Sequence, residues 1–231
     1  GDGGGSGDGG GSGDGGGSGD GGGSGGIDDP EDRPHYTPTN MDPDPETAKQ
    51  GVRTHIKAAR DGLKSDPPDP DLTIKEAKEA LKIDGTNIDA VVLLAHAYYT
   101  KKLYDTAETI LDMLLRDRKD AAPKNAGVYY VYGLIYDKTN EPVKALKAYQ
   151  TAVDLWPTYP AALMNLGVHQ LRNKQYDDAM QTYELLTGDL QNRDASTWSS
   201  LGSAYRGKSA DFDSASSERG TWLLKAEEAY K

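Results

Sequence analysis

The stretch that decides the fold runs from residue 126 to residue 193: AGVYYVYGLIYDKTNEPVKALKAYQTAVDLWPTYPAALMNLGVHQLRNKQYDDAMQTYELLTGDLQNR. One pattern occurs in it twice at a constant offset. Three residues of the first copy recur 34 residues later, namely Gly133 as Gly167, Ala145 as Ala179 and Tyr149 as Tyr183. A fixed period of this length is typical of stacked helical repeats and not of a single closed core.

Each copy has the pattern of a helical hairpin. In the first copy Gly133 carries no side chain, so two helices can approach closely there, and Tyr136 lies beside it. Ala145 and Ala152 give the second helix a thin face. Pro157 then ends that helix, because proline cannot continue one.

This hairpin resembles the tetratricopeptide repeat (TPR). The consensus of that family has a large residue, Leu, Gly and Tyr on the first helix, Ala, an aromatic residue and Ala on the second, and Pro after it. The residues at the family spacing are Tyr129, Tyr132, Gly133, Tyr136, Ala145, Tyr149, Ala152 and Pro157. The resemblance implies an all-α, right-handed α-solenoid that acts by binding proteins.

Residues 46–231 are predicted to form four to five such hairpins. The first helix of the first hairpin, near residues 46–65, departs most from the family pattern. In the second hairpin Ala95 replaces the glycine, and four extra residues, Ala122–Asn125, are expected in a loop at an edge of the solenoid. Gly133, Gly167 and Gly202 are predicted to be buried where helices touch.

The fifth hairpin is interrupted. Tyr205 and Ala226 are separated by twenty-one residues where the consensus has nine, which predicts an insertion of twelve residues before the second helix. The pattern then stops in mid-hairpin. We expect an apolar assembly end there, formed by Trp222, Leu223, Leu224 and Tyr230.

The composition excludes several classes of partner and site. The chain has 231 residues, 26 of them basic and 37 acidic, and its net charge of -11 argues against nucleic acid and anionic membranes as partners. Without cysteine it has no disulfide, thiol chemistry or Cys-based zinc site. The sequence contains no run of about 18 apolar residues, so direct membrane insertion is not expected.

The N-terminal residues 1–26 are four copies of Gly-Asp-Gly-Gly-Gly-Ser followed by two glycines. Such a composition predicts a flexible tether. The alternative is a set of extended helices with three residues per turn, because every third residue is glycine. In either case O-glycosylation is a candidate modification at Ser6, Ser12, Ser18 and Ser24.

Residues 27–45 contain five prolines and six acidic residues among nineteen, which predicts a stiff, extended spacer. The alternative is a peptide that docks into a groove with Tyr36 and Met41 as its anchors. Thr37 and Thr39 flank Pro38 and are further candidates for O-glycosylation.

Catalysis and cofactors are not expected. The four histidines, His35, His55, His96 and His169, fall in separate segments and show no spacing typical of a metal site. No glycine-rich loop follows a strand to hold a phosphate. We therefore predict no catalytic residue, metal or cofactor.

Binding of a protein is the function that the resemblance implies, because the first helices of TPR hairpins line the concave wall. A hydrophobic or extended peptide is the expected ligand of this wall. The alternative is that several of these residues only pack against neighbouring helices. The residues carried over by position are Val92, His96, Tyr99, Tyr130, Leu134, Asp137, Met164, Val168, Leu171, Arg172, Ser199, Ser203 and Arg206.

The Gly/Ser/Asp tether, the acidic spacer and segments such as LAHAYY and LGSAYRG together are similar to TPR lipoproteins of the bacterial adventurous gliding machinery. A first residue other than Met fits a processed and exported form. The expected location is therefore the cell surface, the extracellular space or the periplasm, and the partners are envelope proteins or copies of this chain.

Two functions follow as hypotheses. One is an exported structural subunit that assembles head to tail into a filament, because the assembly end and the first hairpin each lack a neighbouring repeat. The other is a scaffold that binds partner peptides within a multi-protein envelope machine.

Overall fold

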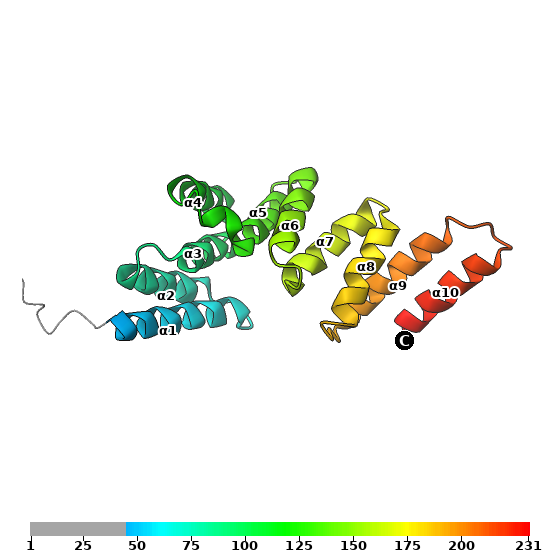
Figure 1. Ribbon diagram of the computed structural model, residues 1–231, viewed down its shortest axis with the longest axis horizontal. Helices are drawn as coiled ribbons and strands as arrows, with labels where there is room; N and C mark the ends of the chain where they lie inside the picture. The colour runs from blue at the N-terminus through cyan, green and yellow to red at the C-terminus, as the bar shows by residue number, and fades with distance from the viewer. Residues whose placement is uncertain (1–44) are drawn as a thin grey trace, which may run out of the picture. The chain divides into compact units, whose positions relative to one another are not determined.

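The computed structural model describes residues 45–231, which form an all-helical structure without a strand (Figure 1). This confirms the predicted all-α class for the described part of the chain. Its α-helices are α1 (Pro45–Lys64), α2 (Pro70–Ile83), α3 (Ile88–Thr100), α4 (Tyr104–Asp117), α5 (Ala126–Lys138), α6 (Pro142–Leu155), α7 (Pro160–Arg172), α8 (Tyr176–Thr187), α9 (Ala195–Ser209) and α10 (Ser217–Ala229).

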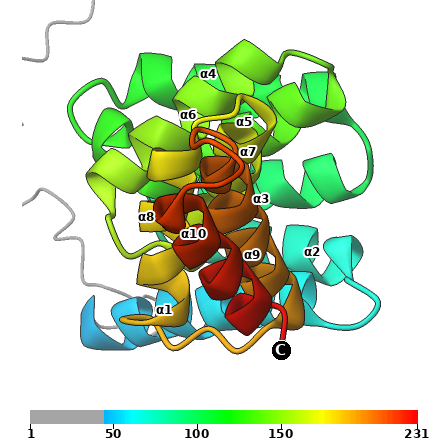
Figure 2. The same ribbon diagram turned by 90° about the vertical axis from the view of Figure 1, so that its right-hand side faces the viewer.

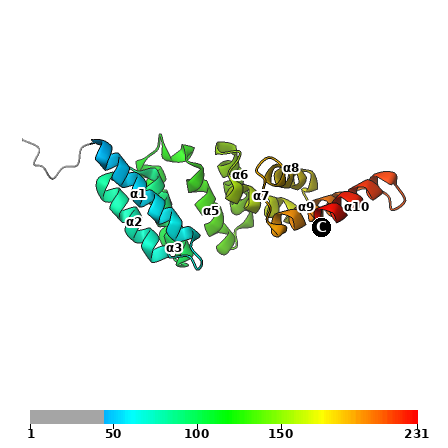
Figure 3. The same cartoon turned by 90° about the horizontal axis from the view of Figure 1, so that it is seen from below.

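The ten helices form five hairpins, which we number as repeats 1 to 5, from α1–α2 to α9–α10. Every helix packs against the next one along the chain, as Figures 2 and 3 show from two further sides. First helices of adjacent repeats also touch, in the pairs α1 and α3, α3 and α5, and α7 and α9. The helices therefore stack in chain order, as expected of a solenoid.

The turns inside repeats 2, 3 and 4 share one geometry. Each has three residues, and its middle residue, Lys102, Asn140 or Lys174, has a φ of 63°, 61° or 59°. Such a left-handed residue commonly ends a helix and lets the next backbone N–H bond back onto it. In repeat 2 that bond runs from Leu103 N to Tyr98 O, at 3.0 Å.

The predicted glycines are buried at the contact between the two helices of their hairpins. A Cβ atom on Gly133 would lie 2.6 Å from Tyr149 Cδ1, and one on Gly167 would lie 2.6 Å from Tyr183 Cζ. Gly202 has the same relation to Tyr230, at 2.7 Å from Cε1. Glycine is therefore required because the ring of the second helix occupies the space of a side chain.

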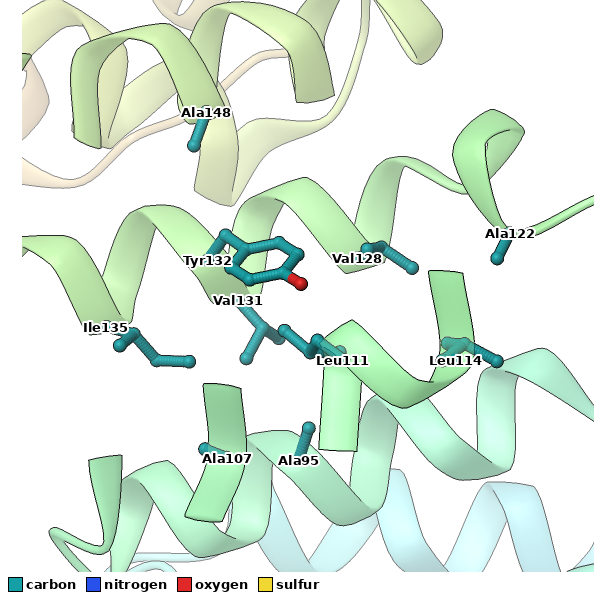
Figure 4. Packing of buried hydrophobic residues seen from close by; sticks show 10 residues of the cluster. All are labelled: Ala95, Ala107, Leu111, Leu114, Ala122, Val128, Val131, Tyr132, Ile135 and Ala148. Carbon is teal, nitrogen blue, oxygen red and sulfur yellow. The ribbon is translucent and has the colours of Figure 1, made fainter. Parts of the chain in front are cut away.

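The main core lies between repeats 2 and 3 (Figure 4). Leu111 of α4 and Val131 and Ile135 of α5 are buried in it together with Ala95 of α3. Figure 4 shows the α4 and α5 side chains reaching toward each other between the ribbons. Of the four extra residues, Ala122–Asn125, Ala122 belongs to this core as well.

The connection between α4 and α5 has eight residues, whereas those between α2 and α3 and between α6 and α7 have four. The extra residues were predicted as an edge loop. They form a 3-10 turn, Ala122–Lys124, whose Ala122 is fully buried in the core. The position of the insertion was predicted correctly, but it also packs, because its small apolar residue reaches the core.

The ring contact confirms that repeat 5 has twelve additional residues, but only six of them precede the second helix, where all twelve were expected. Tyr230 lies 28 residues after Gly202, whereas Tyr183 lies 16 residues after Gly167. Compared with repeat 4, two of the additional residues lengthen the first helix, four lengthen the turn, and six lie in α10 ahead of the ring, although α10 as a whole is only one residue longer than α8. The hairpin of α9 and α10 is therefore longer than those of repeats 2, 3 and 4.

The close contact at Gly167 gives a test of the register. We expect Gly167→Leu to lower the free energy of unfolding by about 3 kcal/mol, because the new side chain overlaps the buried Tyr183 ring. Urea unfolding followed by circular dichroism measures this change.

The matched control is Gly220→Ala, in the exposed part of α10, where an added Cβ meets no atom within 4 Å. This control should stabilise the chain by about 0.5–1 kcal/mol, since alanine favours the helix. Equal unfolding midpoints for Gly167→Leu and the unchanged chain would show that the register is wrong.

Candidate functional site

The inner face is defined here by three positions on each first helix: three residues before, one after and four after the small residue of the helix contact. The small residues are Ala95, Gly133, Gly167 and Gly202. Every side chain at these positions is half-buried or exposed, and none is fully buried. In chain order they are Val92, His96 and Tyr99, then Tyr130, Leu134 and Asp137, then Met164, Val168 and Leu171, and finally Ser199, Ser203 and Arg206.

These positions change in character along the chain. Repeats 2 and 3 carry most of the aromatic rings and the carboxylate. In repeat 4 the half-buried Met164 and Leu171 also pack against the core of repeats 4 and 5, so part of their surface has a structural role. Arg172 and Arg206 are exposed. The inner face is therefore aromatic at repeats 2 and 3 and carries one exposed arginine, Arg206, at repeat 5.

Six rings follow one another across repeats 2 and 3, and we call this row the aromatic ladder. His96 lies between Tyr99 and Tyr130, with centroids 5.9 Å from each. Tyr130 is 5.1 Å from Tyr159, which stacks at 4.5 Å on Trp156. At the other end Tyr104 of α4 lies 5.7 Å from Tyr99. The rings come from α3, α4, α5 and the connection between α6 and α7.

A polar centre adjoins the ladder at Asp137, near the end of α5. Tyr149 donates its hydroxyl to Asp137 Oδ2 at 2.8 Å, and His169 Nε2 lies 2.8 Å from Asp137 Oδ1. Tyr149 and His169 are buried, but 28% of the Asp137 side chain is exposed. The Tyr149 ring also lies 6.2 Å from Tyr130, so the centre and the ladder are continuous.

Burial perturbs the phenols of this region. It raises the pKa of Tyr130 to about 12, with a smaller contribution from the Tyr99 hydroxyl. Burial, followed by the Tyr104 hydroxyl and the Asp137 carboxylate, raises the pKa of Tyr99. Burial and the bond to Asp137 also raise the pKa of Tyr149. These tyrosines are therefore neutral hydrogen-bond donors at physiological pH, and Asp137 acts electrostatically on two of them.

His96 is the ring at the centre of the ladder. Removal from water lowers its pKa from the ordinary value of 6.5 to about 4, because no carboxylate stands beside it to favour the charged form. The imidazole is therefore neutral at pH 7 and contributes an aromatic face.

Of the thirteen inner-face residues predicted from the sequence, six lie in repeats 2 and 3, but five participants were missed, namely Tyr104, Trp156, Tyr159, Tyr149 and His169. Trp156 and Tyr159 flank Pro157, and the proline predicts the end of a helix but says nothing of the rings beside it. Tyr149 was assigned only to the helix contact. His169 lies two residues after Gly167, a buried position, so no periodicity pointed to its bond with Asp137.

The predicted assembly end is partly used inside repeat 5. Trp222 is half-buried, with its ring 5.9 Å from Tyr205 and Lys225 Nζ 4.5 Å from its centroid. Tyr230 covers Gly202 and is 48% exposed. Leu223 and Leu224 are 42% and 67% exposed and remain available for contacts. The tail anchors Tyr36 and Met41 and the candidate glycosylation sites lie outside the described residues.

Within residues 45–231 no group of three or more acidic, histidine or cysteine side chains is arranged to hold a metal ion. None of the helices described here is both long enough and apolar enough to cross a membrane. A hollow between α6, α7 and α8 is lined by residues such as Val143, Leu146 and Leu185.

Comparison with known families gives one match, to the tetratricopeptide repeat, over residues 68–127 and 138–203. These segments make up more than half of the chain. No curated protein matches the chain in sequence. The match covers repeats 2 and 4 and the second helix of repeat 3, leaves out most of α5, and reaches into the hairpins on both sides.

Solved structures of TPR proteins are similar to the chain. A crystal structure of MamA protein is 23% identical, covers 78% of this chain and 92% of its own, and gives a TM-score of 0.51. PilF of Pseudomonas aeruginosa is 17% identical, covers 79% and 78%, and gives 0.57. At these identities the similarity shows the fold alone. The resemblance to gliding lipoproteins has no support among these matches.

The lowered pKa of His96 predicts a pH-dependent stability. Between pH 6.5 and about 4 the unfolded chain binds a proton at His96 that the folded chain does not, so the free energy of unfolding falls as the pH falls. Urea midpoints at pH 7 and pH 5 measure the loss. We expect a smaller loss for His96→Gln, which cannot take up this proton. An equal loss in both proteins would mean that His96 is protonated in the folded state.

Proposed function

Because the chain belongs to the tetratricopeptide repeat family, whose repeats are typically non-catalytic scaffolds for protein–protein interaction, we propose that its inner face binds an extended segment of a partner protein. The observation that carries this proposal is the aromatic ladder. It crosses two repeats and the connection that follows them, so one bound segment can contact several helices at once.

The chemistry of the ladder suits a binding surface. Tyrosine and tryptophan provide a large contact area at a low cost in conformational entropy, and they are enriched among the residues that dominate binding energy. Tyr99, Tyr130 and Tyr159 are only half-buried, and Trp156 is 49% exposed. Tyr99 and Tyr130 pack partly against the core, and Tyr159 is held by its contacts with Tyr130 and Trp156, so part of each ring is fixed and the rest is free to meet a ligand.

A phage-display selection tests the proposal. A random library of twelve-residue peptides is presented with the full chain. We expect enriched peptides to bind with affinities that fall about tenfold in Tyr99→Leu and Tyr159→Leu, because the rings supply the contact area. Leucine keeps apolar bulk, so the repeats should stay folded by circular dichroism.

The matched control is Val143→Ser in the hollow between α6 and α8, where the side chain is 80% exposed. It should leave peptide affinity unchanged. A selection that enriches no peptide, or peptides that respond to Val143→Ser and not to the ladder variants, would refute binding at the inner face.

Head-to-tail self-association is the second candidate, and the exposed pair Leu223 and Leu224 on α10 favours it. A filament also needs a complementary surface. No large hydrophobic side chain of α1 is exposed in the described residues, so the proposed joint would pair an apolar patch with a charged helix. This weakens the filament hypothesis relative to peptide binding. Export and envelope partners are proposals that rest on the composition of residues 1–45.

Sedimentation velocity of the full chain over a range of concentrations tests self-association. If α10 forms the joint, Leu223→Asp should abolish concentration-dependent growth, because the contact would bury an unpaired charge. Lys57→Asp, on the exposed face of α1, tests the other end of the proposed joint, because it changes the charge of the surface that α10 would meet. Monomers at all concentrations would exclude the filament.

A further inference from the structure

Asp137 is the carboxylate at its position on the inner face, and repeats 2, 4 and 5 have no carboxylate at the corresponding position. The corresponding residues, four after the small residue, are Tyr99, Leu171 and Arg206. Tyr149 and His169 hold one oxygen each of Asp137, both at 2.8 Å. A carboxylate oxygen can accept about two hydrogen bonds, so each oxygen keeps a free acceptor site.

Asp137 also lacks a permanently charged partner. Among the described residues no lysine or arginine lies within 4.0 Å of its carboxylate, and its only ion-pair contact is His169. Asp89, on the neighbouring first helix α3, differs, since Arg60 Nη2 lies 2.9 Å from its Oδ2. The Tyr149 hydroxyl brings no charge to Asp137, and an imidazole does so only when protonated.

Aromatic rings stand beside this carboxylate. The Tyr130 ring contacts the ring of Tyr149, whose hydroxyl bonds Asp137. Tyr99 joins Tyr130 through His96. Asp137 also contributes to the raised pKa of Tyr99. Ring faces attract cations. In the described chain the lysines that stand over aromatic rings are Lys144 and Lys225, and neither contacts Tyr99 or Tyr130.

We propose that Asp137, with the rings of Tyr99 and Tyr130, binds a lysine or arginine side chain of the segment held on the inner face. This rests on the proposed function and names the chemistry of its ligand. The carboxylate supplies opposite charge and free acceptor sites, and the rings supply cation–π contacts to the same group. Arginine fits best, since its planar guanidinium both stacks on rings and bonds a carboxylate.

Charge complementarity argues against the chain's own spacer as the occupant. Residues 27–45 carry six acidic residues and one arginine, so this segment would bring like charge to Asp137. A basic segment of a partner also gains from the net charge of -11 of the whole chain, which steers cations toward it. The spacer is kept as an arm of the test.

The test continues the peptide selection. We expect the enriched peptides to share a basic residue, and replacement of a peptide arginine by citrulline, its uncharged analogue, to weaken binding at least about tenfold. Asp137→Asn should weaken binding of the arginine peptide to a similar extent and have little further effect on the citrulline peptide. Asp89→Asn, which removes a carboxylate already paired with Arg60, is the matched control and should change affinity much less.

The outcomes separate the two proposals. Peptides that bind at the ladder without a basic residue, or that lose nothing with citrulline, would overturn this inference and leave the proposed function standing. A synthetic peptide of residues 27–45 that binds, and binds more tightly to Asp137→Asn, would assign the site to the spacer and also overturn it. The citrulline comparison uses the unchanged chain, so it decides the question even if Asp137→Asn fails to fold.

Discussion

The contact between a residue without a side chain on the first helix and an aromatic ring on the second sets the geometry of repeats 3, 4 and 5. Gly133, Gly167 and Gly202 let the rings of Tyr149, Tyr183 and Tyr230 lie directly against the helix backbone. Because this contact fixes both the distance and the rotation of the first helix, residues at a constant offset from the glycine face the same way in each repeat. Repeat 2 uses Ala95 with Leu111, a smaller pair, at the same positions.

This regularity explains how much of the fold could be predicted. The 34-residue period and the number of inserted residues follow from counting between the small residues of the first helices and the rings of the second helices. Each ring contacts one particular small residue, so the count between them is fixed. The burial of Ala122 could not be predicted in this way. An insertion breaks the period, and whether it packs depends on where the chain returns to the core.

The candidate site was harder to predict, because it forms between repeats. Offsets within a repeat predict Tyr99, Tyr130 and Asp137 on the inner face, and none of the three is fully buried. The offsets contain no information on partners from the next repeat, so they missed the His169 bond and the stacking of Trp156 on Tyr159. Those contacts depend on how consecutive hairpins are rotated, which varies with the sizes of the packed side chains.

Comparison of repeats 3 and 4 separates what Asp137 does for the fold from what it offers to a ligand. The Tyr149 hydroxyl bonds Asp137, whereas the equivalent hydroxyl of Tyr183 is buried without a well-formed hydrogen bond, since Leu171 replaces the aspartate and only the Ser200 hydroxyl lies near. A buried unsatisfied hydroxyl costs about 1–3 kcal/mol.

Repeat 4 forms the same hairpin despite that cost, so the fold does not require a carboxylate at this position. A neutral acceptor such as asparagine or glutamine would suffice to satisfy the phenol, and would avoid placing a partly exposed charge among aromatic rings. The charge of Asp137 is therefore more than the hairpin needs, and 28% of its side chain is exposed beside the ladder of rings.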